Sequence, residues 1–108
     1  MAKYLFQATY TSEAWAAQVQ NPQNRIEVVR PALERLGGRF ECVYYAFGEY
    51  DLVAILEMPD NVSMAAIALA VSAGGAMKAS KTTVLMTIEE GIEAMRKASG
   101  TGYRAPGR

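Results

Sequence analysis

The feature that most constrains the fold is the run Leu-Val-Ala-Ile-Leu at residues 52–56, which is apolar at every position. A strand with one face in water alternates apolar and polar residues, whereas a strand covered on both faces is apolar throughout. The run therefore predicts a sheet that is covered on both faces. Leaving one face wet would cost several kcal/mol at about 25 cal/mol per Å² of apolar surface. We expect a homodimer or higher homo-oligomer in which the sheet of an identical chain covers this face.

The stretches on either side of Gly48-Glu49 predict a β-hairpin. Both stretches are rich in β-branched and aromatic residues, and a glycine at the first central position suits a type II′ turn. This turn fixes the register, with Tyr45 opposite Leu52. One face of the hairpin is expected to carry Val43, Tyr45, Phe47, Tyr50, Leu52, Ala54 and Leu56. The other face is expected to carry Phe40, Cys42, Tyr44, Ala46, Asp51, Val53 and Ile55.

Periodicity in the rest of the chain predicts the order βαββαβ followed by a C-terminal helix. The predicted elements are a strand at residues 4–10, a short helix after Thr11-Ser12, a longer helix from Asn21-Pro22 to Gly37-Gly38, the hairpin, a helix at 62–73, a strand at 77–87 and a helix at 89–98. Ile92 and Met95 of the last helix are expected to face inward. Such a split βαβ repeat folds most simply as a four-stranded antiparallel sheet with both helices on one face. The expected fold class is α+β, with one domain over residues 1–98 and a Gly/Pro-containing tail over residues 99–108.

Composition excludes several classes of function. The chain has no histidine and a single cysteine, Cys42, which removes Ser-His-Asp and Cys-His nucleophiles, haem held by histidine, and tetrahedral zinc sites. Cys42 is better explained as a small buried hydrophobe than as a reactive thiol. No phosphate-binding GxxxxGK[ST] or GxGxxG motif occurs, and Gly37-Gly38 and Gly74-Gly75 follow helical patterns as C-terminal caps would. We expect no metal and no cofactor.

Charge and hydropathy indicate that neither nucleic acid nor a membrane is a partner. Eleven basic and eleven acidic residues give no net charge, so the positive surface that binds a phosphate backbone is missing. The N-terminal residues mix polar and apolar types, where a signal peptide needs a continuous apolar core, and no apolar stretch reaches the roughly 20 residues of a spanning helix. We expect a cytoplasmic protein, and the single cysteine fits a reducing compartment.

Several short motifs occur together. They are Tyr10-Thr11 near the N-terminus, Leu-Gly-Gly-Arg at residues 36–39, Gly-x-Tyr-Asp at Gly48, Tyr50 and Asp51, and Lys-Thr-Thr at residues 81–83. As a set they make residues 3 to about 98 resemble the GYD domain family, which is similar in fold to the ferredoxin-like, dimeric α+β barrel superfamily. The hairpin also resembles the ligand-binding domain of the leucine-responsive regulators, where a Gly-x-x-Asp hairpin lies at an effector site between subunits. The resemblance implies the fold and dimerisation, and it supplies no catalytic residue.

Asp51 is the central candidate for a site, and two interpretations of it remain open. In the first it is structural, and accepts hydrogen bonds from nearby backbone or from Tyr44. In the second it is a partly buried carboxylate that lines a ligand-binding cleft, with Lys81 as its best candidate partner in an ion pair or as an anion-binding group. The candidate ligand-binding residues are Tyr44, Tyr45, Tyr50, Asp51, Lys81, Thr82 and Thr83. Trp15 and Arg25 either line a pocket mouth or pack as ordinary amphipathic residues.

Three functions follow from these interpretations. The first is a small-molecule-binding module that takes an amino acid or an aromatic or carboxylate metabolite. The second is a cofactor-independent enzyme, similar to some monooxygenases and isomerases of the same superfamily, with Asp51 as the base and a tyrosine or Lys81 as the acid or oxyanion partner. The third is a structural assembly protein. The sequence predicts no DNA-binding segment, so a regulatory role would require a partner.

Overall fold

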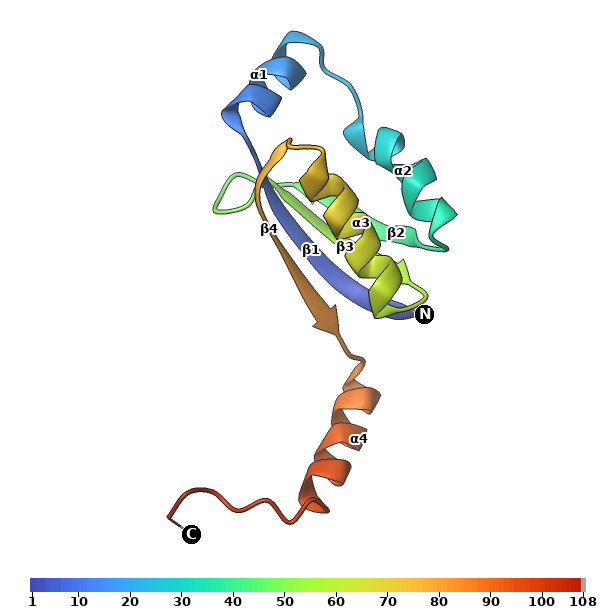
Figure 1. The fold of residues 1–108 in the computed structure, drawn as a ribbon, viewed down its shortest axis with the longest axis vertical. Coiled ribbons are helices and arrows are strands. Elements are labelled where there is room, and N and C mark those ends of the chain that lie inside the picture. The colour runs from blue at the N-terminus through green and yellow to red at the C-terminus, as the bar shows by residue number, and fades with distance from the viewer. Residues whose placement is uncertain (108) are drawn as a thin grey trace.

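The sheet at the centre of the computed structural model has four antiparallel strands, and helices cover one of its faces (Figure 1). Residues 1–107 are described. The elements in chain order are β1 (Ala2–Tyr10), α1 (Ser12–Gln20), α2 (Arg25–Arg35), β2 (Arg39–Tyr45), β3 (Leu52–Met58), α3 (Asn61–Ala73), β4 (Met77–Leu85) and α4 (Ile88–Ser99). The strand order is β2-β3-β1-β4. The predicted α+β fold with its four-stranded antiparallel sheet is confirmed, and α1 and α2 together connect the first two strands.

The core lies between one face of the sheet and the helices α2 and α3. Alternate residues of β1 and β3 point to this face, because successive side chains of a strand lie on opposite sides. The buried core residues are Tyr4, Phe6, Ala8, Leu33, Ala54, Leu56, Met58, Met64 and Ile67. The hydroxyl of Tyr4 donates a hydrogen bond to Asn61, the first residue of α3. This bond ties the start of α3 to the sheet.

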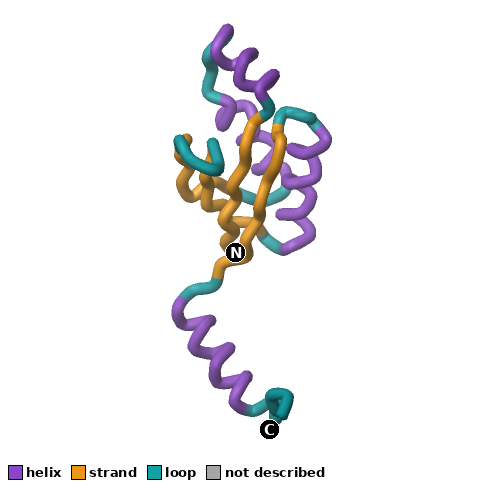
Figure 2. Tube along the Cα trace, turned by 90° about the vertical axis from the view of Figure 1, so that its left-hand side faces the viewer, coloured by secondary structure: helices purple, strands orange, loops and turns teal. Residues whose placement is uncertain are grey.

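The opposite face of the sheet is uncovered in the single chain. Its central residues are Leu5, Gln7, Cys42, Tyr44, Val53, Ile55, Lys81 and Thr83. The helices of residues 1–107 that pack on the sheet lie on the other side (Figure 2). At one end of the uncovered face, Lys3 pairs with Glu41 at 2.7 Å between Nζ and Oε1. This face therefore combines a partly apolar centre with a charged end.

The helix before β2 begins later than the sequence predicts. The side chain of Thr11 caps α1 as expected, by accepting a hydrogen bond from the backbone N–H of Ala14. The prediction that Asn21-Pro22 begins the next helix is wrong, because α1 runs on to Gln20 and Asn21 follows it as the C-terminal cap. The side chain of Asn24 instead accepts two backbone N–H groups at the start of α2, which satisfies donors that a helix end leaves free.

The hairpin has the predicted register but a different turn. Tyr45 lies opposite Leu52, as expected. A type II′ turn requires a positive φ at Gly48, and Gly48 is not among the glycines of residues 1–107 with positive φ. A longer loop connects β2 and β3, and it is tied to β1 by a hydrogen bond from the Thr9 hydroxyl to the Glu49 carbonyl. Phe40 packs on the core side and not beside Cys42, because the register shifts at this point and a bulge reverses the alternation.

α4 extends away from the sheet (Figure 1, Figure 2). A capping box between Thr87 and Glu90 begins the helix. Ile92 is 41% exposed and Met95 is 70% exposed, so the prediction that both face inward is wrong for the single chain. The reason is that α4 continues beyond the end of β4, where residues 1–107 offer no apolar surface to pack against. No helix within residues 1–107 has the length and apolar character needed to cross a membrane. The domain boundary at residue 98 stays a prediction.

Candidate functional site

Asp51 connects three segments at the end of the sheet where β1 leads into α1. Its Oδ2 atom accepts a hydrogen bond from the backbone N–H of Tyr10 and another from the indole Nε1–H of Trp15, each with an N–O distance of 3.0 Å. Its own backbone N–H donates to the carbonyl of Ala8 at 2.9 Å. Asp51 thereby holds α1, through Trp15, against the end of β1. This geometry supports the structural interpretation of the residue.

An aromatic cluster of Tyr10, Trp15 and Tyr45 lies beside Asp51. The ring centroids of Tyr10 and Trp15 are 5.1 Å apart with an interplanar angle of 66°, and those of Trp15 and Tyr45 are 6.1 Å apart. Edge-to-face aromatic pairs contribute about 0.5–1.5 kcal/mol beyond the burial of their surface. Trp15 therefore packs between the sheet and α1, with its indole N–H satisfied by the carboxylate.

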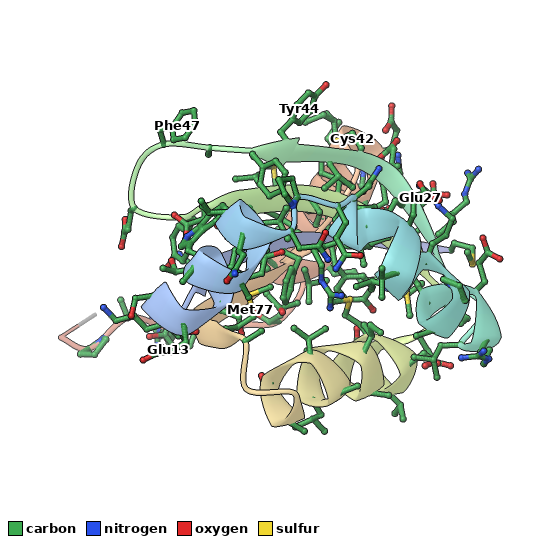
Figure 3. All side chains as sticks on the ribbon, turned by 90° about the horizontal axis from the view of Figure 1, so that it is seen from above. Glu13, Glu27, Cys42, Tyr44, Phe47 and Met77 are labelled. Atoms are coloured by element: carbon green, nitrogen blue, oxygen red, sulfur yellow. The ribbon has the colours of Figure 1, made fainter. Side chains whose placement is uncertain are left out.

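Two cavities meet at Tyr10 on the helix side of the sheet. The first, of about 440 Å³, lies between α1 and the start of α2, and the second, of about 300 Å³, is a groove between α2 and α3. Tyr10, Arg25 and Ala76 line both. We call the second cavity the Tyr10 groove. Its other lining residues are Phe6, Ile26, Val28, Val29, Ala32, Ile67, Ala70, Val71, Gly74 and Met77, and Met77 lies between the helices in Figure 3.

The hydroxyl of Tyr10 is the polar group at the centre of this arrangement. Tyr10 is 6% exposed, and its hydroxyl donates to no other group of residues 1–107. No fully buried side-chain polar atom in this range lacks a partner, so solvent in the cavities reaches the hydroxyl oxygen. Burial raises the pKa of the Tyr10 phenol above its ordinary value, Tyr45 and Asp51 raise it further, and the Arg25 guanidinium opposes the shift. Near neutral pH the phenol is therefore protonated and can donate a hydrogen bond.

The candidate residues from the hairpin separate onto different sides of the molecule. Tyr45 lies on the helix side, where it contacts Trp15 near Asp51. Tyr44 is 68% exposed and points away from the helices (Figure 3). Tyr50 lies in the loop between β2 and β3 and is partly exposed. None of these four candidate residues lines either of the two cavities. Tyr44 and Tyr45 line another cavity, of about 500 Å³, between α2 and β2.

The candidate residues of β4 also alternate between the two faces. Lys81 lies opposite Gln7 and Thr83 opposite Leu5, both on the uncovered face. Thr82 lies opposite Phe6 and therefore points to the helix side. The Lys-Thr-Thr stretch cannot act as one cluster, because neighbouring side chains of a strand lie on opposite sides.

Asp51 and Lys81 do not form the expected pair. None of the ion pairs within residues 1–107 includes either residue. Asp51 lies just before β3 and directs its carboxylate to Trp15, whereas Lys81 is exposed on the uncovered face. The prediction of this partnership is wrong, because the carboxylate follows the loop toward α1 and does not follow the alternation of the hairpin strands.

The motif that contains Asp51 belongs to a larger pattern along the chain. The model of the GYD domain family matches residues 4–95. The chain belongs to the GYD domain family. In this GYD domain, the Gly-x-Tyr-Asp motif lies at the end of the β2–β3 loop, and its aspartate connects that loop to β1 and α1.

Two solved structures have a fold similar to that of this GYD domain. The crystal structure of MtbAldR matches with a TM-score of 0.57 and 15% identity over 80% of this chain and 53% of that chain. The crystal structure of FFRP-DM1 matches with a TM-score of 0.50 and 13% identity over 80% of this chain and 100% of that chain. The GYD chain thus spans about half the length of the MtbAldR chain. At these identities the likeness shows the fold alone, which is ferredoxin-like as expected. No significant match to a curated protein is found.

Sequence reasoning did not identify Tyr10 as a candidate. In the sequence it is one more apolar position in an alternating strand, and nothing local distinguishes it from Tyr4. One signal was present, because Tyr10 is the last strand residue before the helix cap at Thr11, and cavities form where a strand leaves the sheet. The sequence offers Arg25 for a pocket mouth, and the structure places it on both cavities.

Proposed function

We propose that this GYD domain binds a small molecule in the Tyr10 groove. The observation that carries the proposal is a nearly buried tyrosine that lines an apolar groove and whose hydroxyl has no partner within residues 1–107. Buried polar groups normally have hydrogen-bond partners, which are either protein groups or water. A bound ligand with an acceptor atom can replace the solvent that reaches this hydroxyl.

The size and walls of the groove support this proposal. Small-molecule sites have volumes of roughly 300–1,000 Å³ and apolar walls with few polar groups. The Tyr10 groove has about 300 Å³, and the adjoining cavity at α1 has about 440 Å³. Tyr10 and Arg25 provide the polar groups at the place where the two meet. The Tyr10 groove is thus an apolar compartment, and the adjoining cavity, which Gln18, Gln20, Asn21 and Gln23 also line, is its polar end.

An enzyme that uses Asp51 as a general base has less support. The Oδ2 atom of this carboxylate already accepts hydrogen bonds from Tyr10 and Trp15. Both donors hold the local structure, so proton transfer to this oxygen would compete with them. Binding requires no such competition, because Asp51 does not line the groove.

A variant that fills the groove tests the proposal. Ala70 and Ala65 are both exposed alanines of α3, and only Ala70 lines the groove. Ala70→Phe therefore narrows the groove from its rim, and Ala65→Phe is the matched control on the same helix. The measurement is a thermal-shift screen of the wild type and both variants against small carboxylates, amino acids, aromatic alcohols, quinones and flavins. A ligand that binds the folded state raises the melting temperature by mass action.

The proposal predicts at least one compound that stabilises the wild type and Ala65→Phe but not Ala70→Phe. If the compounds that bind stabilise all three proteins equally, the ligand lies elsewhere and the groove is not the site. If no compound in these classes stabilises the wild type, small-molecule binding of the proposed kind is rejected.

We also propose that the protein is a homodimer or a higher homo-oligomer that buries the uncovered sheet face. Leu5, Val53 and Ile55 form adjacent positions on this face and remain partly exposed in the single chain. A second sheet packed on these residues would remove apolar surface from water, which is favourable by about 25 cal/mol per Å². Sedimentation equilibrium at micromolar concentration measures the oligomeric state directly, and a monodisperse monomer would contradict this proposal.

A further inference from the structure

We propose that the ligand of the Tyr10 groove is a small organic anion, a monocarboxylate with a compact apolar body. Its carboxylate binds between the guanidinium of Arg25 and the hydroxyl of Tyr10, and its apolar body lies between α2 and α3. This inference rests on the proposed function, because it names the ligand class of the same groove.

Arg25 has the position that an anion-binding group needs. It is the first residue of α2, lines both cavities and is partly buried. Within residues 1–107, no ion pair includes Arg25. Arginine forms strong, geometrically specific hydrogen bonds with carboxylates because its N–H groups match the two oxygens. The guanidinium is therefore available for a ligand at the polar end of the groove.

The nearby acidic residues do not cancel this positive charge. Glu27, two residues further along α2, already pairs with Arg30 at 3.0 Å between Oε1 and Nη2. Asp51 lines neither cavity, and its Oδ2 atom accepts hydrogen bonds from Tyr10 and Trp15. Arg25 is therefore the one charged side chain among the residues that line the groove.

Two further features add to the preference for an anion. The positive end of the α2 dipole lies at Arg25, which favours a negative charge nearby. The N–H groups of Ile26 and Glu27 already donate to Asn24, so the dipole and not these groups acts on the ligand. The Tyr10 hydroxyl is a neutral donor near neutral pH, for the reasons given above, and a donor suits an anionic acceptor. Tyr10 and Arg25 thus present hydrogen-bond donors and one positive charge from two different elements.

The walls of the groove define the rest of the ligand. Apart from Tyr10 and Arg25, the lining side chains are apolar. Four of them also line a small, fully apolar pocket next to the groove: Phe6, Val29, Ile67 and Val71. A second charge on the ligand would be desolvated there without a partner, which is costly. The groove therefore selects a single anionic group attached to an apolar body.

Three probes with one common body test the inference by isothermal titration calorimetry near neutral pH. They are phenylpropanoate, phenylpropanol and phenylpropylamine, which present an anion, a neutral hydroxyl and a cation on the same phenylpropyl group. Because hydrogen bonds to charged groups are stronger than those to neutral groups, we expect the wild type to bind the acid about 10-fold more tightly than the alcohol. The amine should bind most weakly. Arg25→Gln should weaken the acid by about 10- to 100-fold and leave the alcohol unchanged.

Two other variants separate the contributions of the site. Tyr10→Phe keeps the ring in the core and should weaken the acid by about 3- to 10-fold. Arg35→Gln is the control, because Arg35 is an exposed arginine of the same helix that lines neither cavity. Circular dichroism verifies that each variant is folded. If Arg25→Gln does not fold, the anion preference is tested with Arg25→Lys and with the ratio of the affinities of the wild type for the acid and the alcohol.

The outcomes distinguish this inference from the proposed function. Equal binding of acid and alcohol, with no effect of Arg25→Gln, overturns the anion preference while the groove remains a binding site. If none of the three probes binds the wild type, the inference is overturned, and the comparison of Ala70→Phe with Ala65→Phe decides the proposed function separately.

Discussion

Replacing Asp51 by alanine is expected to lower the free energy of unfolding by about 3 kcal/mol, because one carboxylate oxygen serves two donors. Hydrogen bonds to a charged acceptor contribute about 1.5–3 kcal/mol each. Both N–O distances are 3.0 Å, and Asp51 is only partly buried, so the lower figure applies to each bond. Asp51→Asn keeps an oxygen that both donors can reach, and a loss of about 1 kcal/mol is expected.

The contribution of the indole can be isolated from that of the backbone. Trp15→Phe removes the Nε1–H donor and keeps an aromatic ring beside Tyr10, with an expected loss of about 1.5 kcal/mol. Urea unfolding followed by far-UV circular dichroism measures all variants. Trp15 is the only tryptophan of the chain. In the wild type and in the Asp51 variants its fluorescence therefore reports the environment of this one contact.

The double variant Asp51→Ala/Trp15→Phe provides the sharpest test. If the hydrogen bond is as described, it is lost only once, and the double variant is destabilised by about 3 kcal/mol instead of the sum of about 4.5 kcal/mol. Additive losses would refute the direct contact between the two side chains. A stability of Asp51→Ala within about 0.5 kcal/mol of the wild type would refute the structural role of the carboxylate altogether.

Gly38→Ala should destabilise the fold by about 1–3 kcal/mol, because its new Cβ would meet the fully buried side chain of Met58. Gly48→Ala, whose Cβ would meet nothing within 4 Å, should stay within about 0.5 kcal/mol in the same denaturation experiment, and equal losses would contradict the crowding argument. The Oδ1 atom of Asp60 caps α3 by accepting the backbone N–H of Ser63 at 2.7 Å, and this bond lowers the pKa of Asp60. A lowered pKa in the folded state gives stabilisation that is present above the unfolded pKa and is lost as the pH falls through the folded pKa. The difference in melting temperature between the wild type and Asp60→Ala should therefore be largest near neutral pH and disappear in acid, and its persistence in acid would count against this cap.

The elements that sequence could predict are those set by local periodicity. The apolar run of β3 indicates a central strand, and the structure places β3 between β2 and β1. The register of Tyr45 opposite Leu52 follows from the short distance between the two strands in the chain. The prediction of which face each side chain occupies failed where one extra residue enters the strand. The bulge near Phe40 reverses the alternation of β2, and no residue type at this place indicates a bulge.

The candidate site could not be predicted in the same way, because it depends on contacts between distant parts of the chain. The hydrogen bond between Tyr10 and Asp51 joins residues 41 positions apart. Its geometry depends on the sheet pairing of β1 with β3 and on the length of the loop before β3. The sequence indicated the importance of Asp51 through its motif, but the direction of the carboxylate toward Trp15 required the three-dimensional arrangement.

The strand order has a consequence for how the chain reaches its fold. β1 precedes both of its neighbours in the chain, and its partners β3 and β4 are Leu52–Met58 and Met77–Leu85. During synthesis, both edges of β1 therefore stay unpaired while the β2–β3 hairpin forms locally. Pairing across such a long separation is slow, because a large loop must be ordered before the contacts form. The last pairing, in which Lys3 lies opposite Leu85, forms only after α3 has been synthesised, and the edge of β1 that stays unpaired until then is open to aggregation.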